Sequence, residues 1–181
     1  MKIRKLLLSL GVFLMTPAFC HAENNDISNI INNDINFSTR QYSLMLQQIG
    51  REGKVRIPKT IDDWCSGFFP GSLCYLYQLT NDKSWLLQSR RFTEALDSIQ
   101  YLTWHHDVGF MIGSSYLNIY RLSPNKAYKK AIIQTAKSLC TRFRKKAGVI
   151  QSWNVDRGWQ SKRGWTCPVI IDNMMNLELL F

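Results

Sequence analysis

Apolar residues recur every three or four positions over much of this chain, which is the spacing of an amphipathic helix. Such stripes predict four helices, over residues 70–80, 85–102, 108–122 and 128–143. Asn81-Asp82 and Ser123-Pro124 interrupt the pattern and mark the ends of helices. Another helix is predicted to begin near Pro168, after a loop rich in Gly and Trp.

Strands are poorly supported by the same pattern. Val149-Ile150 and Val169-Ile170-Ile171 are β-branched, but these runs are short and lack flanking hairpin turns. The sequence therefore predicts an all-α fold, with helices joined by loops of unequal length. Because connecting segments on a rigid scaffold commonly carry function, we expect the functional site in the loops that contain Trp, Asp and Gly.

The first 22 residues have a different character. Basic residues precede an apolar stretch over residues 6–15, and Ala22 closes a short polar region, which together predict a signal peptide. A lipoprotein anchor at Cys20 is the less favoured interpretation, because bulky Phe19 precedes the cysteine. We therefore expect a secreted or periplasmic protein that has no membrane attachment after removal of the signal.

The mature chain is predicted to begin with a mobile leader over residues 23–36, which is rich in Asn, Asp and Ile. The domain proper is expected over residues 37–181, with Ser38 as a candidate N-cap of a helix that ends at Gly50.

Composition supports one ordinary globular core. Hydrophobic residues make up 45% of the 181 positions, which excludes a disordered chain. The net charge of +10 falls to +7 without the three basic residues of the signal segment, so we expect an anionic partner. Four cysteines remain, and their pairing or burial as free thiols stays open: Cys65, Cys74, Cys140 and Cys167.

Several common chemistries lack their motifs here. The sequence has no phosphate-binding Gly-rich loop, no His-Glu-x-x-His and no Gly-x-Ser-x-Gly. His105 and His106 are adjacent and are expected to point in different directions, so we expect no metal site and no cofactor. Arg142, together with the basic residues 144–146, is predicted to lie in solvent at a helix end, and not to bind nucleic acid.

Two segments combine acids with apolar residues and amides. Asp107 lies within residues 104–111, and Asp172 precedes Asn173 and Asn176. Either aspartate alone fits an N-cap as well as it fits catalysis. However, Asp172 and Asn176 share one helix face among apolar neighbours, and burying both costs several kcal/mol unless they have partners. This second pattern favours a functional site.

A pair of carboxylates in a pocket is typical of enzymes that act on sugars. Aromatic rings that stack on sugar faces would suit such a site, although each ring also fits a role in packing helices together. Five tryptophans lie in or beside loops: Trp64, Trp104, Trp153, Trp159 and Trp165.

The sequence resembles glycoside hydrolase family 88, the unsaturated glucuronyl hydrolases, from Asp63 to Phe181. The matching motifs are Asp63-Trp64-Cys65-Ser66-Gly67-Phe68-Phe69-Pro70-Gly71-Ser72-Leu73, His106-Asp107-Val108-Gly109-Phe110-Met111, Gln151-Ser152-Trp153, and the run from Pro168 to Phe181. Their order and spacing also agree with the family.

The resemblance implies an (α/α)6 barrel with its site at one mouth. It further implies hydration of the C4=C5 double bond of unsaturated glucuronic acid at the end of lyase-generated glycosaminoglycan oligosaccharides. Asp172 would protonate C4 and activate water, and Asp107 would support the developing positive charge. Substrate contacts are expected from four residues: Trp64, His106, Asn173 and Trp153.

Family members are about twice as long, so we expect only the N-terminal part of the barrel here. Three alternatives stay open: an inactive truncated remnant, an unsaturated rhamnogalacturonyl hydrolase, and a glycan-binding protein without catalysis. Because an open toroid would leave the apolar residues from Met174 to Phe181 uncovered, we expect the isolated chain to aggregate or to remain partly molten.

Overall fold

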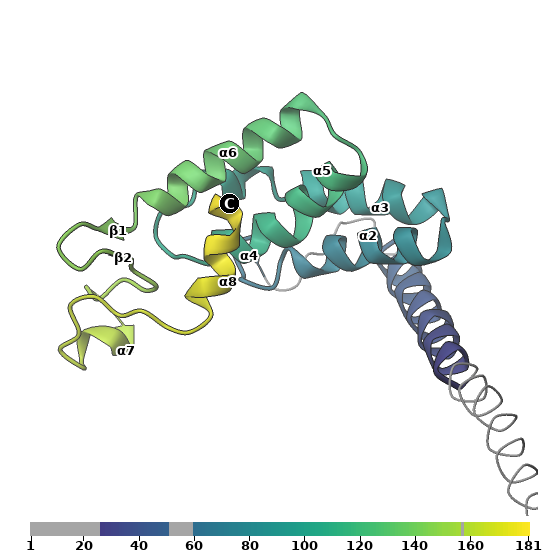
Figure 1. Cartoon of the computed structure of the whole chain (residues 1–181), viewed down its shortest axis with the longest axis horizontal. Helices are drawn as coiled ribbons and strands as arrows, with labels where there is room; N and C mark the ends of the chain where they lie inside the picture. The colour runs from purple at the N-terminus through teal and green to yellow at the C-terminus, as the bar shows by residue number, and fades with distance from the viewer. Residues whose placement is uncertain (1–25, 51–59, 157) are drawn as a thin grey trace, which may run out of the picture. The chain divides into compact units, whose positions relative to one another are not determined.

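The computed structural model describes residues 26–50, 60–156 and 158–181 (Figure 1). The predicted signal peptide, residues 1–22, lies outside the described residues. The chain divides into two compact units, Met1–Leu46 and Gln47–Phe181. No helix in the described ranges has both the length and the apolar character needed to cross a membrane.

The first unit is described from residue 26, and residues 26–50 are helical. Ser38 lies inside this helix, so the predicted helix start at Ser38 is wrong. Ile27, Ile31 and Ile35 are four positions apart and extend the helical apolar spacing into the segment predicted as a leader. That segment is therefore helical from residue 26, and its mobility stays a prediction.

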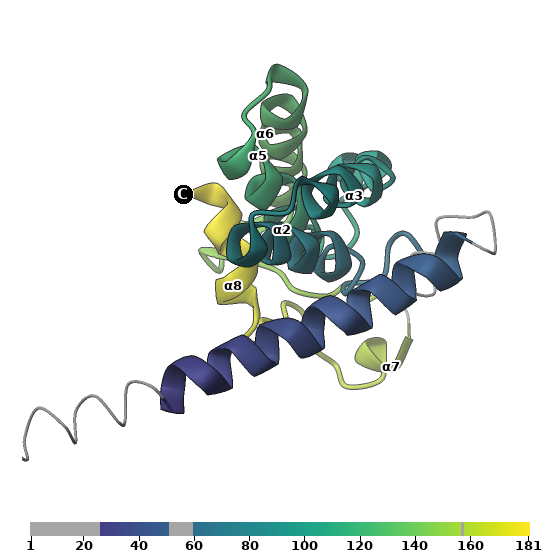
Figure 2. The same ribbon diagram turned by 90° about the vertical axis from the view of Figure 1, so that its right-hand side faces the viewer.

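The second unit contains a helical hairpin, which Figure 2 shows nearly end-on. Helix α2 (Phe68–Thr80) ends at Asn81, which adopts a left-handed conformation with φ of 56°. Helix α3 (Lys83–Glu94) follows at once, because the Asp82 side chain caps it by accepting a 2.8 Å hydrogen bond from the Ser84 amide. The hairpin is tied inside by Ser89, whose hydroxyl donates to the Pro70 carbonyl at 2.8 Å.

Helix α3 ends earlier than the predicted boundary at residue 102. A 3-10 helix, η1 (Asp97–Tyr101), replaces its last turns. Leu96, Ile99 and Leu102 are spaced by three, and a 3-10 helix aligns residues at that spacing on one face. Leu96 and Ile99 are accordingly buried in the core.

The predicted helical segment over residues 108–122 is confirmed as three consecutive elements. Helix α4 (Val108–Ile112) widens into a π-helical turn, η2 (Gly113–Leu117), and continues as α5 (Asn118–Leu122). Helix α6 (Lys126–Cys140) starts where the Asn125 side chain accepts a hydrogen bond from the Tyr128 amide at 2.8 Å. These elements enclose the core, in which the following residues are at most 1% exposed: Leu96, Ile99, Val108, Met111, Ile112, Ile119 and Leu139.

A small hairpin follows α6. Strands β1 (Phe143–Arg144) and β2 (Val149–Ile150) pair antiparallel, with Phe143 opposite Ile150. The prediction against strand pairing is therefore wrong for Val149-Ile150. The connecting turn closes at Gly148, whose φ of +68° favours glycine. The pattern of apolar and polar residues did not predict this turn.

The rest of the chain is mainly irregular. It contains α7 (Gly158–Ser161), α8 (Asn173–Leu177) and a final 3-10 turn, η3 (Glu178–Leu180). The helix predicted to start near Pro168 begins only at Asn173, because residues 168–170 bond to Ser152. The Ser152 amide donates to the Pro168 carbonyl at 2.9 Å, and the Ile170 amide donates to the Ser152 hydroxyl at 3.0 Å. The all-α class is confirmed.

Candidate active site

Helices α4 and α8 lie against each other and bring together the two acidic motifs of the sequence (Figure 1). A Cβ atom at Gly109 would collide with the backbone carbonyl of Asn176, so only glycine permits this approach. The Asn176 side chain then accepts a 2.8 Å hydrogen bond from the Phe110 amide. Asn176 is fully buried, and its predicted need for partners is met.

Asp107 lies in the turn before α4 and receives several polar groups. Its carboxylate oxygens are 3.3 Å from His105 Nδ1 and 3.4 Å from His106 Nε2. The Asn176 amide donates to the same carboxylate at 3.3 Å. The prediction that the two histidines point apart is therefore wrong, because residues 105 and 106 belong to an irregular turn, where side-chain directions do not follow a regular repeat.

These contacts decide the charge of Asp107, whose side chain is 17% exposed. Burial alone would raise the pKa of this carboxyl. The hydrogen bond from His105, the electrostatic attraction of both histidines and the Asn176 amide outweigh burial, so the pKa lies below its ordinary value. Asp107 is thus held as a carboxylate.

His105 has two competing partners at its Nδ1 atom. The atom lies 3.3 Å from the Asp107 carboxylate and 3.2 Å from the Asp107 backbone nitrogen. A protonated Nδ1 donates to the carboxylate, whereas an unprotonated Nδ1 accepts from the amide. The protonation state of His105 therefore selects which of the two bonds forms.

Asp172 occupies the equivalent position before α8 but is differently surrounded. Its Oδ1 atom is buried and has no hydrogen-bond partner among the described residues. Neither Asp107 nor Asp172 makes a side-chain capping bond to its helix. The capping interpretation left open by the sequence is thus wrong for both, and their carboxylates are available for other chemistry.

The two carboxylates and one imidazole form a compact group. Ligand atoms of His106, Asp107 and Asp172 all lie within 4.8 Å of one another. This is also the group, within the described ranges, whose atoms could hold a metal ion. The expectation of acid–base chemistry without a metal stays a prediction.

Two predicted substrate contacts, His106 and Asn173, are buried at this group. His106 is 0% exposed and Asn173 is 3% exposed, and His106 Nδ1 is 3.0 Å from Asn173 Oδ1. Asn173 also donates to the Ile150 carbonyl at 2.9 Å. Their burial indicates support for Asp107 and Asp172, and a direct contact of either with a substrate stays a prediction.

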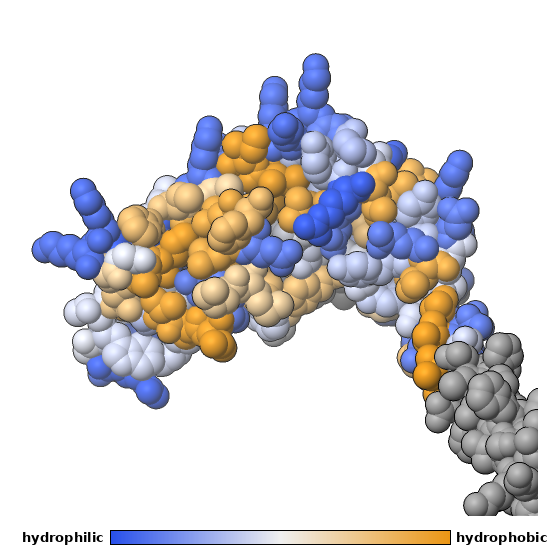
Figure 3. Space-filling model, in the orientation of Figure 1, coloured by the Kyte–Doolittle hydropathy of each residue, from blue (hydrophilic) through white to orange (hydrophobic). Residues whose placement is uncertain are grey.

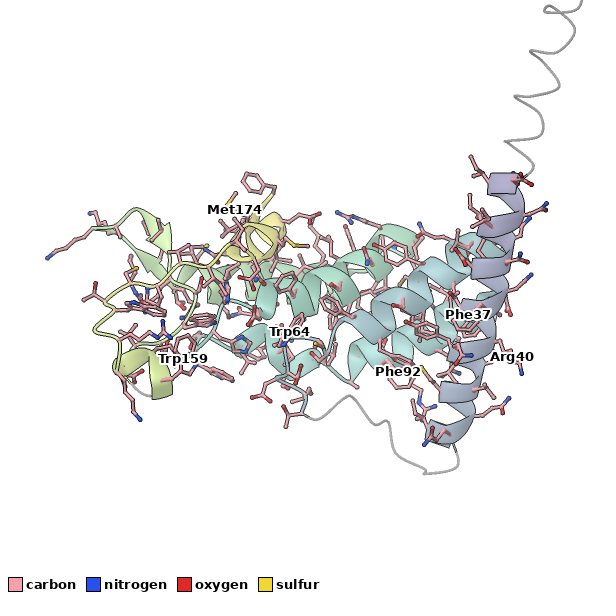
Figure 4. All side chains as sticks on the ribbon, turned by 90° about the horizontal axis from the view of Figure 1, so that it is seen from below. Phe37, Arg40, Trp64, Phe92, Trp159 and Met174 are labelled. Atoms are coloured by element: carbon pink, nitrogen blue, oxygen red, sulfur yellow. The ribbon has the colours of Figure 1, made fainter. Side chains whose placement is uncertain are left out.

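Trp64 is exposed beside α4, as expected for a stacking residue. Its side chain is 52% exposed, and its ring centroid lies 6.2 Å from that of Phe110. Figure 4 labels Trp64 near the middle of the molecule as seen from below. The loop that carries Trp64 and leads into α2 approaches α4 closely at Gly67, where a Cβ atom would collide with the Met111 carbonyl.

A cavity of about 550 Å³ lies next to Asp107. It is lined by Trp104, His105, Trp153, Asn154, Gly158 and Gln160. His105 contacts Asp107 directly and so connects the cavity to the acidic group. The Trp153 ring packs edge-on against Trp159 at 5.3 Å between centroids, and Trp159 in turn packs against Trp165 at 5.6 Å.

Arg142 departs from its prediction as a solvent-exposed residue. Its side chain is 2% exposed, whereas its basic neighbours at 144–146 are exposed as predicted. No local signal in the sequence separates the buried Arg142 from its exposed neighbours, because Arg142 stands in the same basic run. Its hydrogen bonds run to loops that line the cavity and are described below.

The comparisons with known proteins agree with this site. No family model matches the chain. An unsaturated glucuronyl hydrolase from Formosa agariphila is 40% identical over 120 residues, which are 66% of this chain and 29% of the relative. The chain is homologous to the unsaturated glucuronyl hydrolases over this region. The enzyme of that name from Bacillus sp. (strain GL1) is 33% identical over 65% of this chain and 31% of the relative.

A solved structure supports the same conclusion for the fold. A crystal structure of an unsaturated glucuronyl hydrolase specific for heparin has a TM-score of 0.66 and 40% identity, over 81% of this chain and 41% of that chain. The structural neighbours are α/α barrels, which confirms the fold and the family implied by the sequence. The chain spans about 30% of the length of the curated relatives it matches.

Proposed function

We propose that the protein is a glycoside hydrolase that removes unsaturated glucuronic acid from lyase-generated glycosaminoglycan oligosaccharides. The observation that carries the proposal is the pair of aspartates with ligand atoms within 4.8 Å of one another, which His105 connects to the cavity. One is held as a carboxylate by two histidines, and the other keeps a buried oxygen without a partner among the described residues. Different surroundings for two carboxyl groups are the usual basis of divided acid–base roles.

The proposed reaction begins at the double bond. Asp172 in its protonated form gives its proton to C4, and the positive charge develops at C5 and the ring oxygen. Water adds at C5 as its proton passes to the Asp172 carboxylate, which restores the acid. The resulting hemiketal opens and releases the neighbouring sugar, so that one water is consumed for each bond cleaved.

Asp107 would stabilise the oxocarbenium-like transition state. A carboxylate next to a developing cation lowers its energy more than that of the neutral substrate, which is the condition for catalysis. His105, His106 and Asn176 keep Asp107 charged and fixed in position. The exposed ring of Trp64 and the ring of Trp153 at the cavity would stack on sugar faces.

The names of the relatives support an acidic, unsaturated oligosaccharide as substrate. One structural neighbour is described as specific for heparin, and streptococcal relatives are named unsaturated chondroitin disaccharide hydrolases. The net charge of +10 also suits an anionic substrate. We further propose that the protein is exported, since residues 1–22 have the pattern of a signal peptide.

The test follows the ultraviolet absorbance of the conjugated acid, which disappears when the double bond is hydrated. The intact protein is incubated with unsaturated heparin and chondroitin disaccharides, alongside Asp172→Asn. Asp82→Asn is the matched control, because Asp82 is a helix-capping aspartate and Asn caps equally well. We expect absorbance to fall with the wild type and the control only.

Two results would contradict the proposal. Unchanged absorbance with both disaccharides would contradict the proposed activity. Full activity of Asp172→Asn would contradict the proposed role of Asp172 as the acid. Binding of the disaccharides without turnover, unaffected by Asp172→Asn, would instead favour the glycan-binding alternative.

A further inference from the structure

Arg142 is a charged side chain in the interior, and such burial is costly unless every donor finds an acceptor. Its Nε donates to the Gln151 carbonyl at 2.8 Å, and its Nη1 donates to the Thr103 carbonyl at 2.8 Å. Its Nη2 donates to the Ser152 carbonyl at 3.2 Å, and both terminal nitrogens lie 3.2 Å from Asn154 Oδ1. These acceptors are neutral oxygens, which fix the direction of the guanidinium without neutralising its charge.

The guanidinium remains charged in this position. Burial lowers the pKa of Arg142, the charge of Arg144 lowers it further, and the charge of Asp107 raises it, with a result of about 10. At neutral pH the side chain therefore keeps all five N–H donors.

The acceptors are the immediate neighbours of the cavity wall. Thr103 precedes Trp104, Ser152 precedes Trp153, and Asn154 itself lines the cavity. One side chain thus joins the loop before α4 to the loop after β2. The first of these loops continues through His105 to Asp107, so it also carries part of the acidic group.

We propose that Arg142 is a positioning residue for the candidate site, holding the loops at residues 103–107 and 151–154 at the separation that forms the cavity and places Asp107. The proposal rests on the proposed function for its kinetic consequence. Its structural consequence, a local link between two loops, is measured without any substrate.

Two variants test the link at different strengths. Arg142→Lys keeps the charge but loses the planar fork of donors, and Asn154→Ala removes one acceptor and leaves Arg142 in place. Arg91→Lys is the matched control, because Arg91 is exposed on α3 and lies outside both loops.

The first measurement is amide hydrogen exchange. In Arg142→Lys we expect at least tenfold faster exchange at residues 103–107 and 151–154, with α2 and α3 unchanged. In Asn154→Ala we expect faster exchange at residues 151–154 only. Equal acceleration throughout the second unit would assign Arg142 a general structural role and overturn the proposal, as would exchange identical to that of Arg91→Lys.

The second measurement is steady-state kinetics on the unsaturated disaccharide. We expect Asn154→Ala to raise KM with kcat unchanged, because it loosens only the wall of the cavity. Arg142→Lys also loosens the loop that carries Asp107, so we expect a higher KM, a lower kcat and a fall of about 10²-fold in kcat/KM. Kinetics of Arg142→Lys equal to those of Arg91→Lys would overturn the proposal.

The two failures are distinguishable. A wild-type protein without turnover contradicts the proposed function, and the exchange data then decide on Arg142 alone. A wild-type protein with turnover, combined with unaltered loops in Arg142→Lys, contradicts the positioning role and leaves the proposed function intact.

Discussion

The turn before α4 and the turn before α8 present the same residue in contrasting surroundings. Each places an aspartate one residue before a five-residue helix, and in neither does the side chain cap that helix. Asp107 is surrounded by two histidines and an amide, whereas Asp172 keeps one buried oxygen without a partner among the described residues. Local environment, more than residue type, therefore separates a carboxylate fixed by three polar neighbours from one with an oxygen that no described residue bonds.

Helices α4 and α8 also differ, in how many of their residues are buried. All five residues of α4 are buried, while in α8 only Asn173 and Asn176 are buried. Met174 and Met175 are 69% and 64% exposed, and an apolar area is visible on this face of the molecule (Figure 3). Apolar burial holds α4 in place. Asn176 holds α8 against α4 by accepting a hydrogen bond from the Phe110 amide, whereas Asn173 joins α8 to His106 and to the Ile150 carbonyl.

The largest expected effect separates the two aspartates kinetically. If Asp172 transfers the proton and Asp107 only stabilises charge, Asp172→Asn lowers kcat by about 10³-fold or more and Asp107→Asn by about 10²-fold. Single-turnover absorbance measurements on the intact protein would give both values. Equal losses would show that the two environments do not produce two roles.

The next effect tests the close contact between α4 and α8. Gly109→Ala inserts a methyl group against the Asn176 backbone, so we expect local destabilisation of about 1–3 kcal/mol. Faster hydrogen exchange at the Phe110 amide, which bonds to Asn176, reports it. Gly113→Ala is the control, because a Cβ atom there meets nothing within 4 Å. A harmless Gly109→Ala would contradict the description of this contact.

A smaller effect is expected on the stability of the protein at low pH, through the carboxyl group of Asp107. Because the pKa of Asp107 is lowered in the folded protein, its carboxylate contributes stability that is present above the unfolded pKa of about 3.9. That contribution is lost as the pH falls through the folded pKa. We therefore expect the protection of α4 amides, taken relative to their intrinsic exchange rate at each pH, to fall more steeply below pH 4 in the wild type than in Asp107→Asn. Parallel pH profiles of the two proteins would argue against a lowered pKa.

The smallest effect on stability is expected at the exposed side of α8. Replacing Met174 and Met175 by Gln alters exposed side chains, so we expect less than about 0.5 kcal/mol of change in the stability of α4. The same variant should self-associate less in light scattering, because an exposed apolar patch favours association. If this variant self-associated as much as the wild type, the surface that causes association would lie elsewhere.

Local pattern predicted much of this molecule. The apolar spacing of α2, α6 and the segment 108–122 is sufficient to predict those helices, and Asp172 with Asn176 on one face indicated the site. The buried Asn176 side chain was expected to need a hydrogen-bond partner, and the Phe110 amide is that partner. Apart from that long-range pairing, these features depend on residues near one another in sequence or on one helix face.

Other features depend on distant segments and were not predictable in this way. Arg142 is buried because loops at 103 and 151–154 surround it with carbonyl oxygens, and nothing in its own basic run indicates this. The two histidines converge because their turn is irregular. Spacing by three along residues 96–102 fits an α-helix and a 3-10 helix equally, and packing selected the second.

The π-helical turn between α4 and α5 fixes a rotational phase. If the five residues of Gly113–Leu117 wound as an ordinary α-helix, they would turn further about the helix axis than the wider π-helical turn does, and everything before them would rotate relative to α5. Val108 and Ile112 would then leave the core that Ile119 faces, and the Asp107 carboxylate would swing away from α8. The winding of this single turn thus keeps the two acids facing one another.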